Sequence, residues 1–439
     1  MIGIGIVGQI ALEELSHGDL KIVVIDEVNT TSELHFLRDM DGDKSVWTNG
    51  SRVAGYPGGR LNWGKNCSFV TIEGQPPLGD ELQSHLPNLS KRLRKYGFPK
   101  LNLVELKKLG QDKFYVRESQ IFFPEIWIKN VESLQNVKII SGLATEILEE
   151  SNGLVRVLVR QSGDSTKEIY AKKVIVCAGP FGTQELLANS GLISEISPRI
   201  WDHISFSIGS IPLRKVGLTK FGLFGWNRFQ RINVKRCSTY YDKINNIFWT
   251  LRVFPEGIQS LGNSLLRLKK VIRNGEYGSC FSLIGKLAAS FITGKLLFEE
   301  IEIHISADFM DESSAIKSAS YGEGERIDYL TYQDKSIPIS EEFERFIAMT
   351  VENLQLDLKN QLSLNLRGTI EFTEITSSSH HMGTLWNSDA VTQTSPIEIS
   401  QNIFAAGSAI FRTSVPGHPT MLAAATSIIA ADRIKSQLS

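Results

Sequence analysis

Residues 1–27 read MIGIGIVGQIALEELSHGDLKIVVIDE, and this stretch decides the fold. Gly3, Gly5 and Gly8 have the spacing G-x-G-x-x-G, helix formers follow them, and residues 20–25 (LKIVVI) form a β-branched run typical of a buried parallel strand. In a dinucleotide-binding fold the first glycine permits a tight turn, the second lets the backbone approach the pyrophosphate, and the third lets the helix pack closely. The pattern therefore predicts a loop, a helix and a strand that bind a dinucleotide.

The predicted strand ends in the acidic pair Asp26-Glu27, which lies 18 and 19 positions after Gly8. An acidic residue at this place accepts hydrogen bonds from the ribose hydroxyls of the dinucleotide. We expect Asp26 to be this residue, with Glu27 as the alternative.

The strand that should precede the glycine loop is short in this sequence. Such a loop follows a strand of about five residues, but only Met1 and Ile2 precede Gly3. We therefore expect the first strand of the nucleotide fold to be missing, either because the natural start lies further upstream or because the fold is incomplete.

Size and composition set the broad class of the protein. A chain of 439 residues exceeds what one hydrophobic core usually serves, so two domains are expected. The formal net charge of -1 gives no electrostatic reason to expect a nucleic-acid partner. The chain does not open with a basic region, an apolar run and a cleavage site, so a cytoplasmic location is expected. Four cysteines lack C-x-x-C spacing, so we expect reduced thiols and no metal site: Cys67, Cys177, Cys237 and Cys280.

The middle of the chain differs from its ends. Residues 137–180 hold short apolar runs separated by turn formers, which predicts hairpins that lead back into the main sheet. Residues 200–370 have no dinucleotide-type loop, as expected for a separate domain that holds the substrate. Residues 279–298 are as apolar as a membrane span, but Lys286 and Lys295 interrupt the roughly 20 residues that a span needs. We expect a buried or lid helix there, with membrane contact as the alternative.

Three further motifs accompany the glycine loop. They are GGRLNWG at 58–64, VIVCAGPFGTQELLANSG at 174–191, and HHMGT at 380–384 followed by NIFAAGSAIFRTSVPGHPTMLAAATSIIAAD at 402–432. Together the four motifs resemble those of the glucose-methanol-choline (GMC) family of FAD oxidoreductases. The last is the strongest match, since it resembles the family's H-x-x-G-T, its glycine turn, and its [NH]-P-T before a helix of small residues.

The sequence also departs from the family pattern. Arg60 and Leu61 stand where the family has a small residue and a serine. Residues 385–387 (LWN) replace an arginine-methionine pair, which leaves the substrate and the electron acceptor open. No histidine lies within 58–64, so the resemblance implies FAD that is bound without a covalent link.

The resemblance assigns roles to individual residues. A flavin accepts the electrons, so the protein must supply a base for the hydroxyl proton, and histidine, with an unperturbed pKa of about 6.5, suits this role. His380 aligns with the family's catalytic base and His418 with its partner on the substrate oxygen, whereas His381 is expected to pack or support. Trp63 could equally pack in the core, and Cys177 is expected to be a core residue. The cofactor-binding residues are expected to be Gly3, Gly5, Gly8, Asp26, Glu27, Gly59, Asn62, Trp63, Ala178, Gly179, Gly407, Ser408, Pro419 and Thr420.

The expected fold is α/β (α+β), with a Rossmann-like FAD-binding domain built from discontinuous segments and an antiparallel-sheet substrate domain. Residues 1–75, 130–200 and 371–439 are expected to form the FAD-binding domain. Residues 76–129 and 201–370 are expected to form the substrate domain and cap elements.

The expected function is oxidation of an alcohol, such as a sugar or polyol, by hydride transfer to FAD, with an electron acceptor that the sequence does not define. Two alternatives stay open. One is an inactive GMC-like protein that keeps the fold as a binding or scaffold module. The other is a nicotinamide-dependent dehydrogenase, which predicts a self-contained nucleotide domain instead of one built from distant segments.

Overall fold

The structure is a computed structural model that combines helices and sheets, and its description covers part of the chain. The described residues are 1–26, 35–36, 41–42, 53–54, 66–69, 80–96, 98, 115–118, 134–161, 165–193, 199–212, 238–242, 245–255, 300–309, 316–319, 329–332, 336–338, 340–353, 369–371, 376–377, 381–385, 397–412, 414–415 and 419–439. The chain divides into two compact units: residues 1–203, 308–334 and 376–439 form the first, and residues 204–307 and 335–375 form the second. The functional limits of the expected domains stay a prediction.

A parallel sheet lies at the centre of the first unit. Strand β1 (Ile22–Asp26) pairs with β7 (Val137–Ser141), and β11 (Val174–Val176) pairs with β22 (Ile403–Ala405), both in parallel. The apolar sequences of β11 and β22 are buried at every position, whereas β7 has exposed residues at Lys138 and Ser141.

The start of the chain joins these two strand pairs. Ile2 forms parallel bridges to Ile25 of β1 and to Val176 of β11. The Gly3 amide donates to the Ile25 carbonyl at 2.9 Å, and the Cys177 amide donates to the Ile2 carbonyl at 2.7 Å. Residues 1–3 therefore lie in the sheet between β1 and β11, where the expected first strand would lie.

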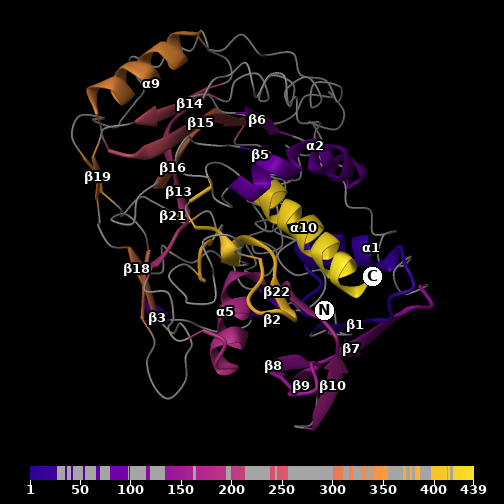
Figure 1. Ribbon diagram of the computed structural model, residues 1–439. Coiled ribbons are helices and arrows are strands. Elements are labelled where there is room, and N and C mark those ends of the chain that lie inside the picture. The colour runs from indigo at the N-terminus through magenta and orange to yellow at the C-terminus, as the bar shows by residue number, and fades with distance from the viewer. Residues whose placement is uncertain are drawn as a thin grey trace, which may run out of the picture. The chain divides into compact units, whose positions relative to one another are not determined.

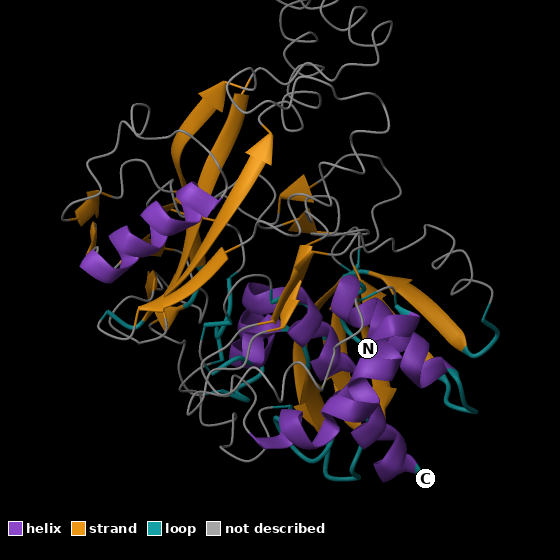
Figure 2. Ribbon diagram, turned by 90° about the horizontal axis from the view of Figure 1, so that it is seen from above, coloured by secondary structure: helices purple, strands orange, loops and turns teal. Residues whose placement is uncertain are grey.

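Helices cover this sheet (Figures 1 and 2). Helix α1 (Ile6–Ser16) and helix α10 (Thr420–Leu438) pack against each other, and α2 (Asp80–Lys95) packs on α10. Helix α5 (Gly179–Asn189) follows β11. The stretch from Met421 to Ala431 in α10 is buried at every position, because its small residues let neighbouring elements approach on all sides.

An antiparallel sheet of three strands forms an excursion between β7 and β11. Strands β8 (Leu143–Glu149), β9 (Val155–Arg160) and β10 (Thr166–Ala171) have the order β10-β9-β8. Every second residue of β9 is buried, and β8 contacts α5. The hairpins that the turn formers predict in this region are confirmed.

Shorter elements complete the first unit. They are β2 (His35–Phe36), β3 (Asp41–Gly42), β4 (Val53–Ala54), β5 (Asn66–Phe69), β6 (Tyr115–Glu118), β12 (Arg199–Ile200), β17 (Ile316–Ala319), β18 (Tyr329–Tyr332), β21 (Thr376–Ser377) and the 3₁₀ turn η6 (Ser408–Ile410).

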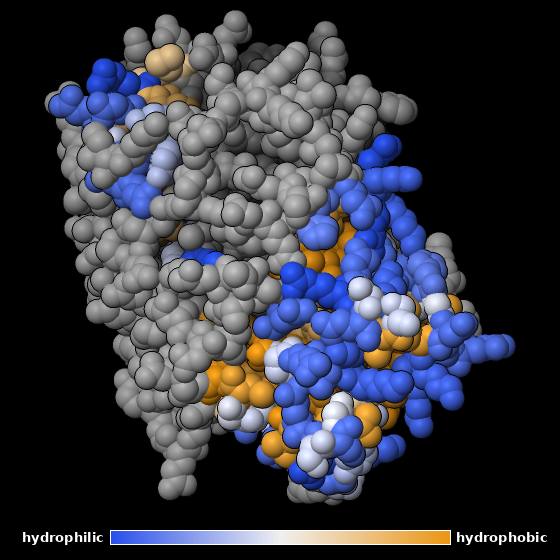
Figure 3. Space-filling view, in the orientation of Figure 1, coloured by the Kyte–Doolittle hydropathy of each residue, from blue (hydrophilic) through white to orange (hydrophobic). Residues whose placement is uncertain are grey.

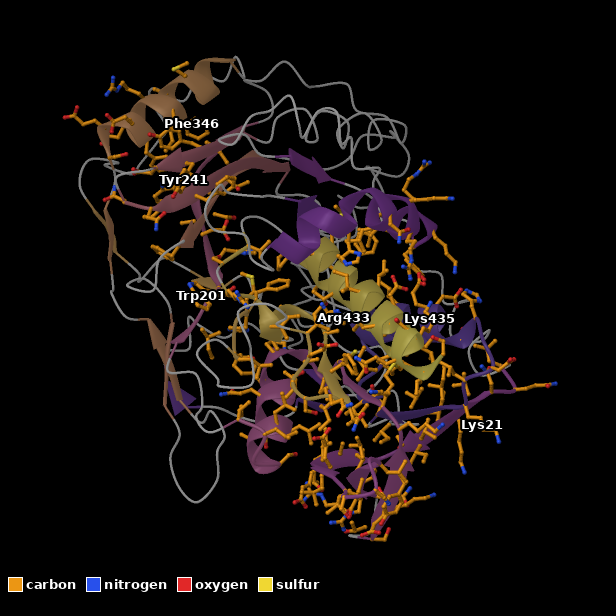
Figure 4. The ribbon with its side chains drawn as sticks, viewed as in Figure 1. Lys21, Trp201, Tyr241, Phe346, Arg433 and Lys435 are labelled. Atoms are coloured by element: carbon orange, nitrogen blue, oxygen red, sulfur yellow. The ribbon has the colours of Figure 1, made fainter. Side chains whose placement is uncertain are left out.

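Four strands that lie largely in the second unit pair in the order β14-β15-β16-β13. Helix α9 packs on β14, and the Phe343 ring of α9 stacks on Trp249 with centroids 3.9 Å apart. The elements are β13 (His203–Pro212), β14 (Ser238–Asp242), β15 (Ile247–Pro255), β16 (Glu300–Phe309), β19 (Ser336–Pro338), α9 (Glu341–Asn353) and β20 (Thr369–Glu371). Figure 4 shows Tyr241 on β14 and Phe346 on α9, whose aromatic side chains belong to this unit.

No described helix combines the length and the apolar character that a membrane crossing requires. Residues 279–298, for which a lid helix or membrane contact was expected, lie outside the described residues. On the face drawn in Figure 3, hydrophilic residues alternate with hydrophobic patches in the described part of the chain.

A partly buried ionic cluster joins α2 to α1 and α10. The Arg92 guanidinium of α2 bonds to the carboxylates of Glu14 and Asp432, and the Tyr96 hydroxyl donates to Glu14 at 2.6 Å. Burial raises the pKa of the Glu14 carboxyl, but the hydrogen bonds from Arg92 and Tyr96 outweigh burial, so the net shift of this pKa is downward. The cluster thus stabilises the ionised form of Glu14 inside the fold.

Arg92→Met is expected to lower the free energy of unfolding by about 3 kcal/mol at pH 7, because it leaves the Glu14 charge buried without its partner. A carboxyl whose pKa is lowered by folding contributes stability above its unfolded pKa of about 4.3, and this contribution disappears as the pH falls through the folded value. The difference in free energy of unfolding between the wild type and Arg92→Met should therefore become smaller at acidic pH. Urea denaturation at several pH values checks this, with Arg94→Met on the exposed side of α2 as the control.

Candidate functional site

The three glycines of the first loop meet different surroundings. Gly3 has φ +88°, and a Cβ there would lie 2.5 Å from the Cys177 carbonyl oxygen. A Cβ at Gly8 would lie 2.1 Å from the Gly3 carbonyl oxygen. At Gly5, by contrast, a Cβ would meet no atom of the described residues within 4 Å. Gly3 and Gly8 are thus required by the fold itself, whereas the surroundings at Gly5 leave room for a ligand.

Helix α1 begins directly beside this open space. Gly5 is its N-cap and makes no side-chain capping bond. The first N–H groups of a helix lack partners within the helix, and the helix dipole adds partial positive charge at this end. An anion is the chemical group that such a helix start accepts most readily.

Asp26 contacts the loop directly. Its carboxylate, at the end of β1, accepts a hydrogen bond from the Ile4 amide, and the residue is half-buried. The sequence predicted a ribose contact for this acid, and the bond to Ile4 is an additional role that the spacing did not indicate. Glu27, the alternative, lies outside the described residues.

The segment after β11 lies against the glycine loop. The Cα of Ala178 would be 2.9 Å from a Cβ at Gly3, and Gly179, with φ +76°, opens α5. Cys177 is buried, and burial raises the pKa of its thiol to about 12. A thiol that stays protonated at neutral pH is no nucleophile, so Cys177 has the core role that the sequence predicted.

The H-x-x-G-T segment and the Gly407-Ser408 turn are held together by hydrogen bonds. The Ser408 hydroxyl donates to the His381 carbonyl at 3.0 Å, and the Gly383 amide donates to the Ser408 carbonyl at 2.9 Å. Gly383 has φ +71°, and a Cβ there would lie 2.3 Å from the ring of Trp201. Glycine is therefore required at this position of the motif.

Two hydroxyls of α10 form hydrogen bonds to the Gly407 turn and to the first turn of α1. The Thr426 hydroxyl accepts a hydrogen bond from the Gly407 amide at 2.8 Å, and the Ser427 hydroxyl donates to the Val7 carbonyl at 2.9 Å. Both residues are fully buried. Sequence reasoning missed them, although two adjacent hydroxyl residues inside an apolar helix are the signal that could have found them.

The start of α10 completes the group of segments. Pro419 is the N-cap residue and Thr420 is the first residue of the helix. The N–H groups in the first turn of a helix lack partners within the helix, and Thr420 provides the first of these in α10.

The geometry resembles that of solved structures. The chain aligns with pyridoxine 4-oxidase from Mesorbium loti at 11% identity and a TM-score of 0.52, covering 99% of this chain and 98% of that one. It aligns with an FAD-dependent oxidoreductase from Chaetomium thermophilum at 13% identity and a TM-score of 0.50, covering 100% and 99%. The fold is that of FAD-dependent oxidoreductases. Neither a protein-family model nor a curated protein sequence matches the chain.

Two histidine-aspartate pairs are buried within this FAD-oxidoreductase fold. His381 Nε2 lies 3.9 Å from Asp202 Oδ2, and its ring packs against Phe181 at a centroid distance of 5.0 Å. His203 Nδ1 lies 3.2 Å from Asp308 Oδ1. The packing of His381 agrees with the supporting role that the sequence predicted for it.

The other predicted site residues lie outside the part of the chain that the structure describes. These are the candidate catalytic pair His380 and His418 and the cofactor-binding candidates Glu27, Gly59, Asn62 and Trp63. Their roles stay predictions. Within the described ranges no group of three or more His, Cys, Asp or Glu side chains could hold a metal ion.

Gly8→Ala is expected to lower the free energy of unfolding by about 3 kcal/mol, because the new methyl would overlap the Gly3 backbone, which no change of rotamer can relieve. Gly18→Ala is the matched control, since a Cβ at this exposed glycine meets nothing within 4 Å. Urea unfolding of both variants checks the result. Equal stability of the two would contradict the close approach of α1 to the loop.

Proposed function

We propose that this protein is an FAD-dependent oxidoreductase of the GMC kind, which binds FAD without a covalent link and oxidises an alcohol group. The observation that carries the proposal is the contrast among the loop glycines. Gly3 and Gly8 are closely backed by main chain, whereas Gly5 is the N-cap of α1 and borders space that none of the described residues fills. This is the division of roles that a pyrophosphate site requires.

The architecture supports a Rossmann-like nucleotide domain made of distant segments. Residues 1–3 occupy the place of its first strand, and β1, β7, β11 and β22 form the parallel sheet around them. The order of a strand, a glycine loop, a helix and an acid-ending strand is the order that binds a dinucleotide. A self-contained nicotinamide domain would not need the residues near 178 and 407.

The chain offers a set of residues that would hold FAD. The start of α1 would take the phosphates, Asp26 or Glu27 the ribose, and the glycine turns near 179 and 407 would flank the remainder. The full set is Gly3, Gly5, Gly8, Asp26, Glu27, Gly59, Asn62, Trp63, Ala178, Gly179, Gly407, Ser408, Pro419 and Thr420.

The chemistry assigned to the chain itself is proton transfer. Bound FAD supplies the acceptor for the hydride of the carbinol carbon. His380 takes the hydroxyl proton, and His418 donates a hydrogen bond to the same oxygen, which stabilises the charge that develops there. The substrate class is an alcohol, such as a sugar or polyol.

The absorption spectrum of the purified protein tests the proposal. FAD bound to this chain should give flavin bands, and acid or heat should release the flavin into the supernatant because no covalent link holds it. Flavin that stays with the precipitated protein would contradict the non-covalent mode. Absence of flavin, together with failure of the apoprotein to bind added FAD, would favour a scaffold role. Binding of a nicotinamide dinucleotide in its place would favour the dehydrogenase.

A further inference from the structure

The peptide groups of Ile4 are held from two sides by buried or half-buried side chains. The Ile4 amide donates to the Asp26 carboxylate, and the Ile4 carbonyl accepts a hydrogen bond from Gln9 Nε2 at 3.0 Å. Ile4 is 3% exposed, and Gln9 is fully buried. Since Ile4 lies between Gly3 and Gly5, these two bonds fix the conformation of the glycine loop at its centre.

Gln9 reaches Ile4 because of its place on α1. It is the fourth residue of the helix, and helical side chains lean toward the N-terminus, so its amide group lies over the residues that enter the helix. The Gln9 backbone amide also donates to the Gly5 carbonyl at 2.9 Å. Main chain and side chain of one residue thus hold two consecutive carbonyl groups of the loop.

The oxygen atom of the Gln9 side-chain amide indicates that this residue does more than stabilise the fold. Its Oε1 atom is buried and has no hydrogen-bond partner among the residues that the structure describes. An unpaired buried oxygen costs free energy, and an apolar side chain of similar size would fill the same space without this cost. The donor group toward Ile4 is therefore the feature that distinguishes glutamine here.

We infer that Gln9 is a positioning residue for the dinucleotide. Together with Asp26 it holds the Ile4 peptide so that the open side of Gly5 and the first turn of α1 receive the two phosphates without rearrangement of the loop. The inference rests on the proposed function. Preorganisation of this kind raises affinity because the loop does not lose conformational freedom on binding.

Gln9→Met provides the test, because it keeps the length of the side chain and removes the donor. The apoprotein of each variant is titrated with FAD, and quenching of flavin fluorescence gives the Kd. The expected Kd is about tenfold higher than that of the wild type, as for the loss of one hydrogen bond at the upper end of its usual contribution. The melting temperature of the apoprotein should change little, because the lost bond is offset by removal of the unpaired oxygen.

Ile10→Val is the matched control on the same helix. Ile10 is fully buried next to Gln9, and its loss of a methylene weakens packing without touching Ile4. The control should lower the melting temperature and leave the Kd for FAD unchanged. Amide hydrogen exchange in the apoprotein adds a second readout, since exchange at residues 3–6 should accelerate in Gln9→Met and not in Ile10→Val.

The possible outcomes separate this inference from the proposed function. Wild-type affinity in Gln9→Met, or an equal loss of affinity in Gln9→Met and Ile10→Val, would overturn the positioning role while leaving FAD binding intact. A wild-type apoprotein that does not bind FAD would overturn the proposed function and this inference with it. A selective loss of affinity in Gln9→Met supports both.

Discussion

Gly5→Val is expected to abolish FAD binding while the apoprotein stays folded. Within the described part of the chain, a Cβ at Gly5 meets nothing within 4 Å, and the residue has φ -61° and ψ -171°, which a branched residue also adopts. The variant therefore fits the fold of the apoprotein. The new methyl groups would occupy the space through which a pyrophosphate approaches the backbone, so the loss should be steric and complete.

Two measurements check this expectation: circular dichroism with thermal melting of the apoprotein, and titration with FAD. Gly18→Val is a suitable control, because Gly18 also has an open environment but lies beyond the end of α1. Full flavin content in Gly5→Val would show that the loop does not hold the phosphates. Loss of the fold in Gly5→Val alone would show that the space beside Gly5 is needed by the chain itself.

His380→Ala is expected to slow the reduction of bound flavin by about 10² to 10⁴-fold, the usual effect of removing a positioned acid-base group. FAD should stay bound, because the residues proposed to hold it are untouched. His418→Ala should have an effect in the same range, since it removes the partner on the substrate oxygen. Anaerobic stopped-flow bleaching of the flavin by an alcohol substrate gives the rates.

His381→Ala separates the catalytic assignment from a general effect on packing. The His381 ring is buried against Phe181 and lies near Asp202. The fall in melting temperature in His381→Ala should therefore exceed the fall in the Gly18→Val control. Flavin reduction should slow less in His381→Ala than in His380→Ala. Near-wild-type reduction in His380→Ala would remove this residue from the mechanism. A larger loss of the flavin-reduction rate in His381→Ala than in His380→Ala would identify His381 as the base.

The local parts of the candidate site could be predicted from the sequence. The G-x-G-x-x-G spacing, the helix after it and the strand ending at Asp26 all depend on neighbours within about 25 residues, and the structure has α1 and β1 at these places. Positive φ at Gly3, Gly179 and Gly407 follows from turns that glycine favours. The hairpins of β8 to β10 were also evident from their turn formers.

The remaining features depend on contacts between segments far apart in the chain. The bond from Asp26 to Ile4, the reach of Gln9 and the bridges of Ile2 to two strands arise only when the sheet is assembled. A ligand role and a loop-supporting role require the same carboxylate at the end of a strand, so spacing could not distinguish them for Asp26. The sequence predicted a missing first strand only because two residues precede Gly3. In the structure Ile2 forms bridges to Ile25 of β1 and to Val176 of β11, and such bridges cannot be predicted from the length of a segment.

The bond from Ser427 to Val7 spans 420 positions of the chain. During synthesis at about 5–20 residues per second, the segment that begins the fold waits on the order of 20 to 80 seconds for its partner helix. The apolar faces of α1 and β1 lack this cover until α10 has left the ribosome. The packing of α1 against α10 is thus expected to form late and slowly, with a long interval in which a chaperone can bind the nascent chain.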